Sequence, residues 1–499
     1  MSSAPRAAGR SAADLRASIE AFLQHAKQPA LLEPGEDLLP LTGENWTLEF
    51  HGARLVLQAW DRQRNLSRHV LDVTEESAAR LQLTVERFAR RQGPLFLVDL
   101  ARRAGAEAGR RSGRLVFRER FRYFLRRQFP EWKLAELSAE ANLEHSLSPA
   151  FPRAFLRHGQ QAMAALACPP EGDSGAVLTF GLIWLSYLRA RERRVTPEGL
   201  ALYLPAGAER ATALRLLCLD PEAARFELFT YTPEDFVVRV DPRDHGNLDT
   251  RLEACRRPEP NQAAWQSLRE LPGVEQVPKH DGRVSLRVHG LEFAEIAGAD
   301  LRFGLAEHRP GGAHHLGEIA RLVEELGRAR TAQAADRDHP LFRRNPEAWL
   351  ESQVRAGIDV IDASLRADPV YDQVPAFAGG ERGVLDLLAV DRAGRLAVVE
   401  LKASADPHLP LQALDYWIRV KWHLDRGEFA SHGYFPGIAL QPDPPRLLLV
   451  APSLEFHPTT EALLRYFSPR IEVERIGLGV EWRRGLEVMF RLSGAERPR

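Results

Sequence analysis

Residues 383–416 read GVLDLLAVDRAGRLAVVELKASADPHLPLQALDY and place an aspartate, a glutamate and a lysine inside apolar runs. Two of these runs, GVLDLLAV and RLAVVELKA, have the length and composition of buried strands. The short polar segment between them predicts a hairpin turn. Charged side chains are rare inside buried strands unless they are paired or bind a ligand. The stretch therefore predicts a strand pair and a functional reason for burying Asp386, Glu400 and Lys402.

The register of this hairpin suggests a metal site. Glu400 and Lys402 are two residues apart and share a face of their strand, and matching faces bring Asp386 close to both near the sheet edge. Two neighbouring carboxylates repel each other unless a cation lies between them. Oxygen ligands favour a hard divalent ion, so we expect Mg²⁺, with Mn²⁺ as a substitute. The lysine can then hold a scissile phosphate or lower the pKa of an attacking water.

This pattern resembles the PD-(D/E)XK nuclease superfamily over about residues 340–480. Asp386 matches its first acid and Glu400-Leu401-Lys402 its E-x-K, whereas Leu385 stands where the usual proline would be. Within the superfamily, the strand pair is most similar to the C-terminal nuclease domain of NucS-type endonucleases.

Two further positions agree with the resemblance. Gln412 and Tyr416 match the Q-x-x-x-Y signature of the RecB-like branch, on the helix expected after the strand pair. Glu351 lies on the preceding helix, where the superfamily often places another metal-ligating acid. Glu347 competes for that role, but it falls in the first helical turn, where an acid complements the helix dipole. We therefore prefer Glu351.

The resemblance implies a restriction-endonuclease-like α/β sandwich and a Mg²⁺-dependent deoxyribonuclease, an endonuclease by its most similar relatives, acting in DNA repair, recombination or defence. It assigns the metal to Asp386, Glu400 and Glu351, water activation to Lys402, and orientation of the site to Gln412 and Tyr416. The alternative function is a catalytically inactive nucleic-acid-binding or scaffold protein that retains the nuclease fold.

A simpler explanation of the E-x-K segment is a salt bridge between Glu400 and Lys402 on an edge strand. Two observations oppose it. Only five of the 67 basic residues are lysines, and the motif position holds one of them. The salt bridge also leaves Asp386 unexplained inside an apolar strand.

We divide the chain into an N-terminal α+β domain at 1–110, a middle α/β region at 111–333 and the nuclease-like domain at 336–499. In the last, the apolar patterns predict helix, three strands, helix, strand, helix and strand, hence a sandwich with a mixed central sheet. Its first helix begins with Asn345 as N-cap and Pro346 at the first helical position.

Residues 1–330 resemble no family, and neither an internal repeat nor a low-complexity segment is visible in the sequence. The patterns predict a meander of three strands from Trp46, a loop or domain boundary at 256–262, and further strands at 132–137, 199–205, 226–232 and 236–240. They predict helices at 14–27, 75–92, 115–129, 152–167, 208–218 and 315–330.

Composition indicates a soluble globular protein and excludes little else. The 499 residues carry a net charge of −1 and are 44% hydrophobic. Three cysteines without metal or disulfide spacing fit a reducing interior, so we expect a cytoplasmic location. No apolar run is long enough for a membrane span. Residues 1–13 lack the apolar core of a secretory signal, and we favour a disordered tail over a transit peptide.

Positive charge is concentrated at 83–127, which holds 13 arginines against four acids. Arginines neutralise phosphates, so Arg110, Arg111 and Arg114 are candidate DNA contacts. The aromatic residues among them have helical spacing, and we expect Phe117, Phe121, Phe124 and Phe129 to be core rather than stacking partners for bases. The N-terminal region offers a surface for a protein partner or a homodimer.

Two other motifs receive structural interpretations. GDSG at 172–175 resembles a protease nucleophile loop over four residues only, so we expect a turn before an apolar element. His308, His314 and His315 are close in sequence, and we prefer a loop with a polar helix start over a metal site.

Overall fold

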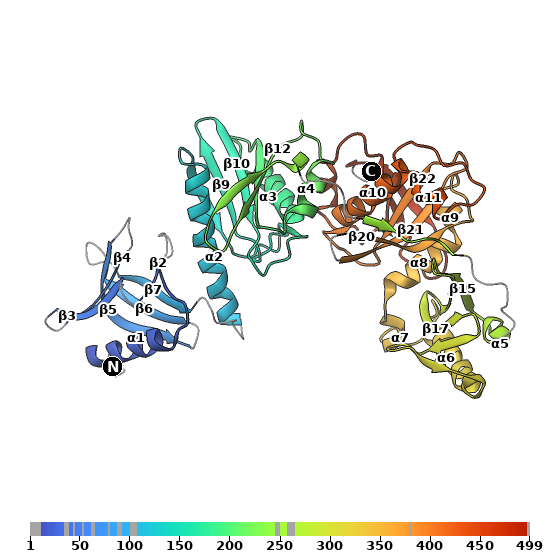
Figure 1. Cartoon of the computed structure of the whole chain (residues 1–499), viewed down its shortest axis with the longest axis horizontal. Helices are drawn as coiled ribbons and strands as arrows, with labels where there is room; N and C mark the ends of the chain where they lie inside the picture. The colour runs from blue at the N-terminus through green and yellow to red at the C-terminus, as the bar shows by residue number, and fades with distance from the viewer. Residues whose placement is uncertain are drawn as a thin grey trace, which may run out of the picture. The chain divides into compact units, whose positions relative to one another are not determined.

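The computed structural model describes residues 11–33, 39–42, 45–51, 54–60, 65–77, 80–86, 92–99, 107–244, 250–256, 265–378 and 381–496. The chain is mixed α/β and forms two compact units, Met1–Glu209 with Glu227–Val240, and Arg210–Phe226 with Asp241–Arg499. Figure 1 shows their helices and sheets. Within the described ranges, no helix combines the length and apolar character that crossing a bilayer requires.

The N-terminal sheet is antiparallel in every described strand pair and has the order β2-β1-β7-β6-β5-β4-β3. Helix α1 (Ala12–His25) starts at a capping box between Ser11 and Asp14 and buries Leu15, Ile19 and Phe22. The strands are β1 (Pro29–Leu32), β2 (Leu39–Pro40), β3 (Trp46–His51), β4 (Arg54–Trp60), β5 (Asn65–Glu76), β6 (Arg80–Glu86) and β7 (Gln92–Asp99). The predicted meander from Trp46 is confirmed. The helix predicted at 75–92 is wrong over β6, where buried and half-buried residues alternate as in a strand.

A second sheet fills the middle of the chain, in the order β13-β12-β11-β10-β9-β8. Its elements are α2 (Glu107–Gln128), β8 (Lys133–Ser138), β9 (Arg153–His158), β10 (Gln161–Ala167), α3 (Val177–Arg191), β11 (Gly199–Pro205), α4 (Arg210–Leu216), β12 (Arg225–Tyr231) and β13 (Val237–Val240). The helix predicted at 152–167 is wrong, because these residues form the β9–β10 hairpin. Gly159, at φ +59°, supplies the left-handed turn conformation.

The aromatic residues of α2 belong to the core, as predicted. Phe117, Phe121 and Phe124 pack with Ala201 and Tyr203 of β11. Helix α3 covers the other face of that strand, where a Cβ on Gly181 would lie 2.9 Å from the side chains of Leu200 and Leu202. The predicted turn at 172–175 leads into α3, with the amide of Gly175 donating to Oδ1 of Asp173.

A five-stranded antiparallel sheet, β15 to β19, was not expected from the sequence. It packs with α6 through Leu286, Phe293, Ile319 and Val323. The elements are β15 (Val274–Pro278), β16 (Val284–Val288), β17 (Leu291–Ala297), β18 (Asp300–Phe303), β19 (Arg309–Gly311), α5 (Gln266–Arg269) and α6 (Leu316–Ala329). Helix α6 confirms the one predicted at 315–330, while the loop predicted at 256–262 lies almost entirely outside the described residues.

The last sheet is mixed, as predicted, in the order β14-β20-β21-β22-β23-β24-β25, with β22, β23 and β24 parallel. Its strands are β14 (Thr250–Leu252), β20 (Tyr371–Ala378), β21 (Glu381–Val390), β22 (Leu396–Leu401), β23 (Arg446–Pro452), β24 (Val473–Leu478) and β25 (Val488–Ser493). The helices are α7 (Pro340–Arg343), α8 (Pro346–Ala356), α9 (Ile358–Ile361), α10 (Leu409–Asp425), α11 (Glu428–Ser431) and α12 (Thr460–Leu464). Asn345 caps α8 by accepting the amide of Ala348 at 3.1 Å, and Trp349, Leu350 and Val354 bury its inner face.

The same order of elements occurs twice in the chain. The series α2-β8-β9-β10-α3-β11-α4-β12-β13 repeats as α8-β20-β21-β22-α10-β23-α12-β24-β25, apart from the short α9 and α11. In both sheets the first three strands are antiparallel, the third and fourth parallel, and the last two antiparallel. The expectation of no internal repeat therefore holds for the residues but fails for the fold.

The core position of the α2 aromatics can be tested on stability. Phe124 is fully buried, so Phe124→Ala should lower the free energy of unfolding by about 3–5 kcal/mol. Leu143→Ala is the control, because Leu143 is 90% exposed and its truncation should have little effect. Denaturant unfolding of the full chain measures both. Equal midpoints for Phe124→Ala and wild type would contradict this packing.

Candidate active site

The backbone pairing of β21 with β22 ends where the side chain of Asp386 takes the place of a backbone partner. The backbone ladder runs from Val390–Leu396 to Leu387–Val399. Beyond it, the amide of Leu401 donates to Oδ2 of the half-buried Asp386 at 2.8 Å. The aspartate thus replaces a ladder partner where the two strands separate. This explains how an apolar strand accommodates a carboxylate.

Glu400 is fully buried on the neighbouring strand, and neither of its carboxylate oxygens has a hydrogen-bond donor among the described residues. In its protonated form it can itself hydrogen-bond to the carboxylate of Asp386, which raises its pKa. The ammonium of Lys402 lies 3.8 Å from Oε1 of Glu400 and 3.9 Å from Oδ2 of Asp406. These distances are too long for hydrogen bonds. The proposed salt bridge is therefore present but does not satisfy the glutamate. A buried carboxylate without donors is costly, unless it is protonated or binds a cation.

Burial and mutual repulsion dominate the protonation of the two acids. Burial raises the pKa of Asp386 to about 6, although the Leu401 amide and Lys402 act in the opposite direction. Burial and then the charge of Asp386 raise the pKa of Glu400 well above its ordinary value, despite Lys402. Neighbouring carboxyl groups with raised pKa values are common at functional sites, which makes this pair the candidate site.

Helix α10 brings Gln412 and Tyr416 to the same place. Burial, and then the negative charge of Glu400, raises the pKa of Tyr416 to about 12, and a hydrogen bond from Gln412 lowers it. The guanidinium of Arg419 lies 5.7 Å from the centre of the Tyr416 ring. The helix therefore presents a neutral phenol to the buried acids.

Glu351 has different direct partners from those expected of a metal ligand. Nη1 of Arg287, on β16, lies 3.3 Å from Oε1 of Glu351 and 2.8 Å from Oδ2 of Asp372, on β20. Burial and then the charge of Asp372 raise the pKa of Glu351 to about 8, with a smaller contribution from Asp386. Glu351 thus lies within the electrostatic reach of Asp386, but its direct contact is Arg287. Glu347, the competing acid, also acts on the pKa of Asp386.

The sequence analysis missed Arg287 and Asp372. Arg287 lies on a strand that was not predicted, about 100 residues before Asp386. Asp372 falls within a predicted strand, but its alternation alone does not separate it from an exposed residue. Only the packing of β16 beside α8 and β20 shows that both side chains are buried and paired.

The described residues fit a divalent metal ion of the Mg²⁺ type. The two oxygens of Glu400 are buried and have no donor among these residues, and Asp386 has a second oxygen besides the one that accepts the Leu401 amide. Among the described residues, no three acidic, histidine or cysteine side chains form a complete ligand cluster. Mg²⁺ is commonly held by one or two carboxylates, with waters and substrate phosphates completing its shell. Asp386 and Glu400 meet that requirement.

The histidines at 308–315 do not form a second metal site with other described residues. Nδ1 of His315 accepts the amide of Gly312 at the start of α6, and His308 lies 3.6 Å from Glu292. The expected polar helix start is confirmed, whereas Arg309–Gly311, expected as loop, form strand β19.

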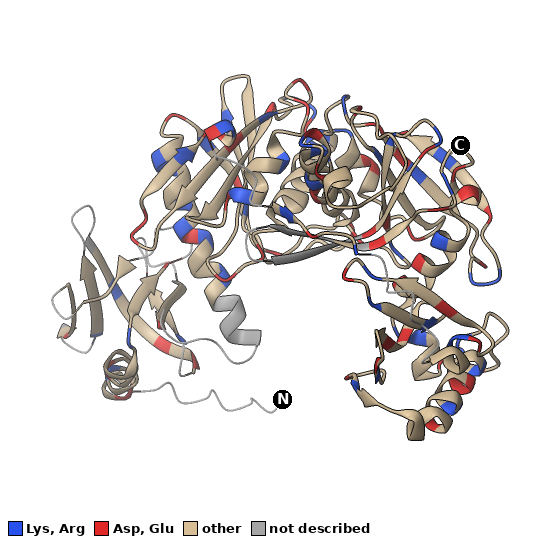
Figure 2. Cartoon of the chain, turned by 45° about the vertical axis from the view of Figure 1, so that its right-hand side comes forward, with Lys and Arg blue, Asp and Glu red and all other residues tan. Residues whose placement is uncertain are grey.

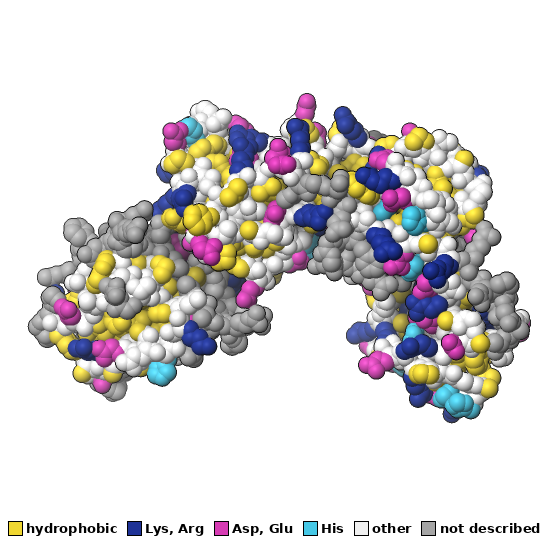
Figure 3. All heavy atoms as spheres, viewed as in Figure 1, with side chains coloured by type: hydrophobic (Ala, Val, Ile, Leu, Met, Phe, Trp, Pro, Cys, Tyr) yellow, Lys and Arg dark blue, Asp and Glu magenta, His cyan; other side chains and the backbone are white. Residues whose placement is uncertain are grey.

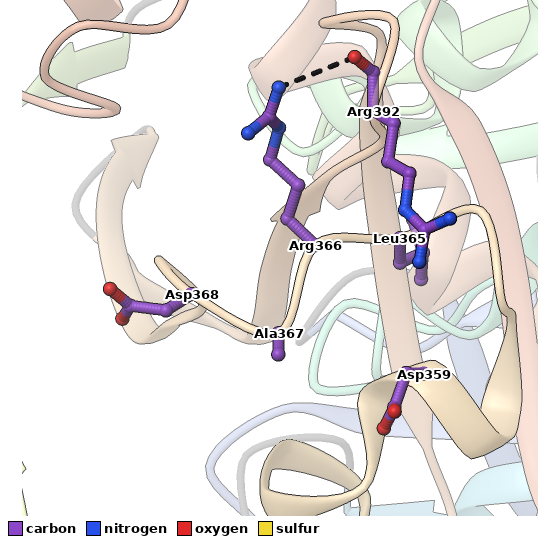
Figure 4. Close-up of a pocket in the computed structure, with 6 residues that line it drawn as sticks. All are labelled: Asp359, Leu365, Arg366, Ala367, Asp368 and Arg392. Atoms are coloured by element: carbon purple, nitrogen blue, oxygen red, sulfur yellow. Dashed lines mark hydrogen bonds between the residues drawn. The ribbon is translucent and has the colours of Figure 1, made fainter.

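Two hollows lie near this part of the chain. One, of about 340 Å³, is lined by residues of β16 and α8 that include Arg287 and Glu351, together with Lys279 and Arg344. This hollow therefore lies beside Glu351, one of the three acids that the resemblance assigns to the metal. The other, of about 530 Å³, is open and is lined by Asp359, Leu365, Arg366, Ala367, Asp368 and Arg392 (Figure 4). It lies at the turn end of the β21–β22 hairpin, away from Asp386 and Glu400.

Several arginines of the segment 83–127 form ion pairs with acidic residues of the middle part of the chain. Arg118 and Arg122 contact the buried Glu119 at 2.7 and 2.8 Å, and Arg120 pairs with Asp235. The basic residues along α2 are visible in Figure 2, whereas basic and acidic side chains are interspersed on the face shown in Figure 3. The side chains of two DNA-contact candidates, Arg110 and Arg111, lie outside the described residues, and the third, Arg114, is half-buried. Ion pairs within the fold therefore account for Arg118, Arg120 and Arg122. The three candidate DNA contacts remain predictions.

The chain is mixed α/β, and where strands β21 and β22 separate it places the half-buried Asp386, the fully buried Glu400 and Lys402 together. Comparison with models of known protein families gives no match, and no curated protein matches the sequence. Function is therefore inferred from the chemistry of the site.

The raised pKa values predict how stability depends on pH. A carboxyl group whose pKa is raised on folding stabilises the protein at low pH, and this contribution is lost as pH rises through the folded-state value. With a chelator present, wild type should therefore lose stability between about pH 4 and pH 8, more than an Asp386→Asn/Glu400→Gln double variant. Mg²⁺ should raise the melting temperature more at pH 8 than at pH 5, because protonated carboxyls bind metal poorly.

Melting curves of both proteins across this pH range, with and without Mg²⁺, measure the difference. Identical pH profiles for wild type and double variant would show that these two acids are not buried against each other.

Proposed function

We propose that residues 336–499 form a restriction-endonuclease-like domain and that the protein is a metal-dependent DNA nuclease, an endonuclease. The observation that carries this is Glu400, whose two oxygens are buried without donors among the described residues, beside Asp386 and Lys402. The mixed sheet and its flanking helices support the proposed fold, since they follow the order predicted from the apolar patterns of the sequence. The intact acid–acid–lysine set favours an active enzyme over an inactive scaffold.

Asp386 and Glu400 would hold the ion, with Glu351 acting through water or through its charge. A bound Mg²⁺ supplies Lewis-acid polarisation of the scissile phosphate and lowers the pKa of the attacking water. The carboxylates also keep their negative charge next to the ion, because a neighbouring cation offsets the burial that otherwise protonates them.

Lys402 has the freedom that its role requires. Its side chain is 17% exposed, and its contacts with Glu400 and Asp406 are long, so the ammonium can turn toward a phosphate or a water. Hydrolysis adds one water across one phosphodiester bond, and negative charge grows on the phosphate oxygens during attack. An ammonium placed against that charge stabilises the transition state.

Tyr416 and Gln412 position this arrangement from α10. A tyrosine phenol is neutral at physiological pH, and the raised pKa of Tyr416, about 12, keeps it neutral at higher pH as well, so it can donate a hydrogen bond. Its strongest charged influence is Glu400. The pair therefore orients the glutamate or the substrate backbone, without taking part in proton transfer.

Substitution of the acids and the lysine tests the proposal. Asp386→Asn, Glu400→Gln and Lys402→Ala should each lower cleavage of labelled DNA in Mg²⁺ or Mn²⁺ by about 100-fold or more, with the fold retained. Lys421→Ala is a matched lysine control, since Lys421 pairs with Asp425 on the surface of α10. Glu472→Gln is the corresponding control for the acids, because Glu472 is half exposed and pairs with Arg395. Full activity of Asp386→Asn would refute the assignment.

The arginine-rich segment yields a prediction for DNA binding. If Arg110, Arg111 and Arg114 neutralise phosphates, their joint replacement by Ala should flatten the salt dependence of affinity by about one unit of log–log slope for each phosphate that is no longer neutralised. Arg328→Ala serves as control, since Arg328 is exposed on α6. Fluorescence anisotropy across a salt series measures both slopes. Equal slopes for wild type and the triple variant would place the DNA-binding surface elsewhere.

A further inference from the structure

The two occurrences of the α-β-β-β-α-β-α-β-β series can be aligned strand by strand. In each sheet the third strand pairs in parallel with the fourth, and the first residues of the fourth strands, Gly199 and Arg446, pair with Met163 and Ala397. Glu400 lies three residues after Ala397, and Leu166 lies three residues after Met163. Glu400 therefore corresponds to Leu166 in the alignment of the two strands. We call residues 107–240 the middle copy and residues 346–493 the C-terminal copy.

A pair of backbone hydrogen bonds confirms this alignment independently. The amide of Lys402 donates to the carbonyl of Val450 at 3.1 Å. The amide of Cys168 donates to the carbonyl of Tyr203 at 2.8 Å. Val450 and Tyr203 occupy the same place in their strands, so Lys402 corresponds to Cys168.

The antiparallel register gives the remaining position. Leu387 pairs with Val399 in the C-terminal copy, as Ala154 pairs with Ala165 in the middle copy. The residue before each is Asp386 and Arg153, and Arg153 pairs with Leu166. The middle copy therefore replaces aspartate, glutamate and lysine with arginine, leucine and cysteine.

These replacements leave the equivalent positions of the middle copy without a carboxylate ligand for a divalent ion. Arg153 is buried and donates to the carbonyl of Glu140 at 2.6 Å. Its guanidinium lies 5.5 Å from the ring centre of Trp184, whose Nε1 donates to the carbonyl of Ala154 at 2.9 Å. Leu166 and Cys168 are also buried. A positively charged guanidinium, packed on an indole, thus stands where the C-terminal copy has Asp386.

Equivalent segments of the two series also meet within the second unit. Leu219, after α4, bridges to Phe467, after α12, and each lies six residues before its next strand. The amide of Asp220 donates to the carbonyl of Tyr466 at 2.8 Å, and the amide of Ser468 donates to that of Cys218 at 2.9 Å. The alignment exchanges these two bonds. Equivalent residues of the two series therefore pair with each other within this unit.

We propose that the middle copy is a catalytically silent partner of the C-terminal copy, so that one chain carries one cutting site and cleaves one strand of a DNA duplex per binding event. This rests on the proposed nuclease function. Each cut adds one water across one phosphodiester bond, and the complementary strand stays intact until a second event or a second chain acts on it. The substrate is duplex DNA and the first product is a nick.

Cleavage of supercoiled plasmid by the full-length protein in Mn²⁺ or Mg²⁺ tests this inference. Nicked circles should accumulate first, with linear DNA forming later from them. Linear DNA formed directly, at a rate proportional to protein concentration, would overturn the inference, because it needs two sites in one chain. At the equivalent positions, Lys402→Ala should lower nicking by about 100-fold or more, while Cys168→Ala should leave it unchanged. Loss of nicking in a Cys168→Ala protein of unchanged melting temperature would also overturn it.

Counting bound Mn²⁺ separates this inference from the function on which it rests. Calorimetric titration should give one site per wild-type chain and none in the Asp386→Asn/Glu400→Gln variant. A site that survives in the variant would overturn the silence of the middle copy, even if the protein cleaves DNA. Absence of both cleavage and Mn²⁺ binding in wild type would overturn the proposed function, and this inference with it.

Discussion

Burial of Asp386 and Glu400 together is the constraint on which the C-terminal site depends. Two carboxyl groups share the end of one strand pair, and one of them has no donor among the described residues. Burial and repulsion raise both pKa values, so the two acids by themselves favour bound protons. A folded protein that keeps such a pair has a costly feature that packing alone does not require. A bound divalent cation would offset the free-energy cost of burying two neighbouring carboxylates. The proposed metal-dependent function rests on this pair of acids.

The surrounding structure holds the acids without neutralising them. Trp349, Leu350 and Val354 of α8 fix one face of the sheet, and α10 covers β22 on its way from the site. Arg287 of β16 pairs with Glu351 and Asp372. Its buried positive charge therefore lies against acids other than Asp386 and Glu400. Lys402 remains the cation beside Glu400. Its long contacts are what a group that acts on substrate needs.

The two copies of the series show that this topology accepts either solution to the same electrostatic problem. In the middle copy, Arg153 carries a permanent positive charge, and Leu166 faces it in place of an acid. Burial lowers the pKa of Arg153, while its guanidinium donates to the backbone carbonyl of Glu140 and lies over the ring of Trp184. In the C-terminal copy the acids are kept, and a cation would have to come from solution. The two sheets share the order of six strands, and they differ in the residues at this one strand end.

Sequence reasoning predicted the C-terminal elements well, because its strands are bounded by turn residues and its helices by caps such as Asn345. It failed at 152–167, where a hairpin buried on both faces shows no alternation and its alanines favour a helix. It brought Asp386, Glu400 and Lys402 together correctly, since a hairpin register is local. It could not find Arg287, whose partners are remote in sequence. The repeated fold could not be predicted from the sequence, because the two copies carry different residues at equivalent positions.

Anomalous scattering from crystals grown with Mn²⁺ tests the central claim most directly, because it locates the ion without relying on activity. The account predicts one peak per chain within coordination distance of Asp386 and Glu400, and none beside Arg153 and Leu166. Absence of a peak at the two acids at saturating Mn²⁺, or a peak in the middle copy, would contradict it.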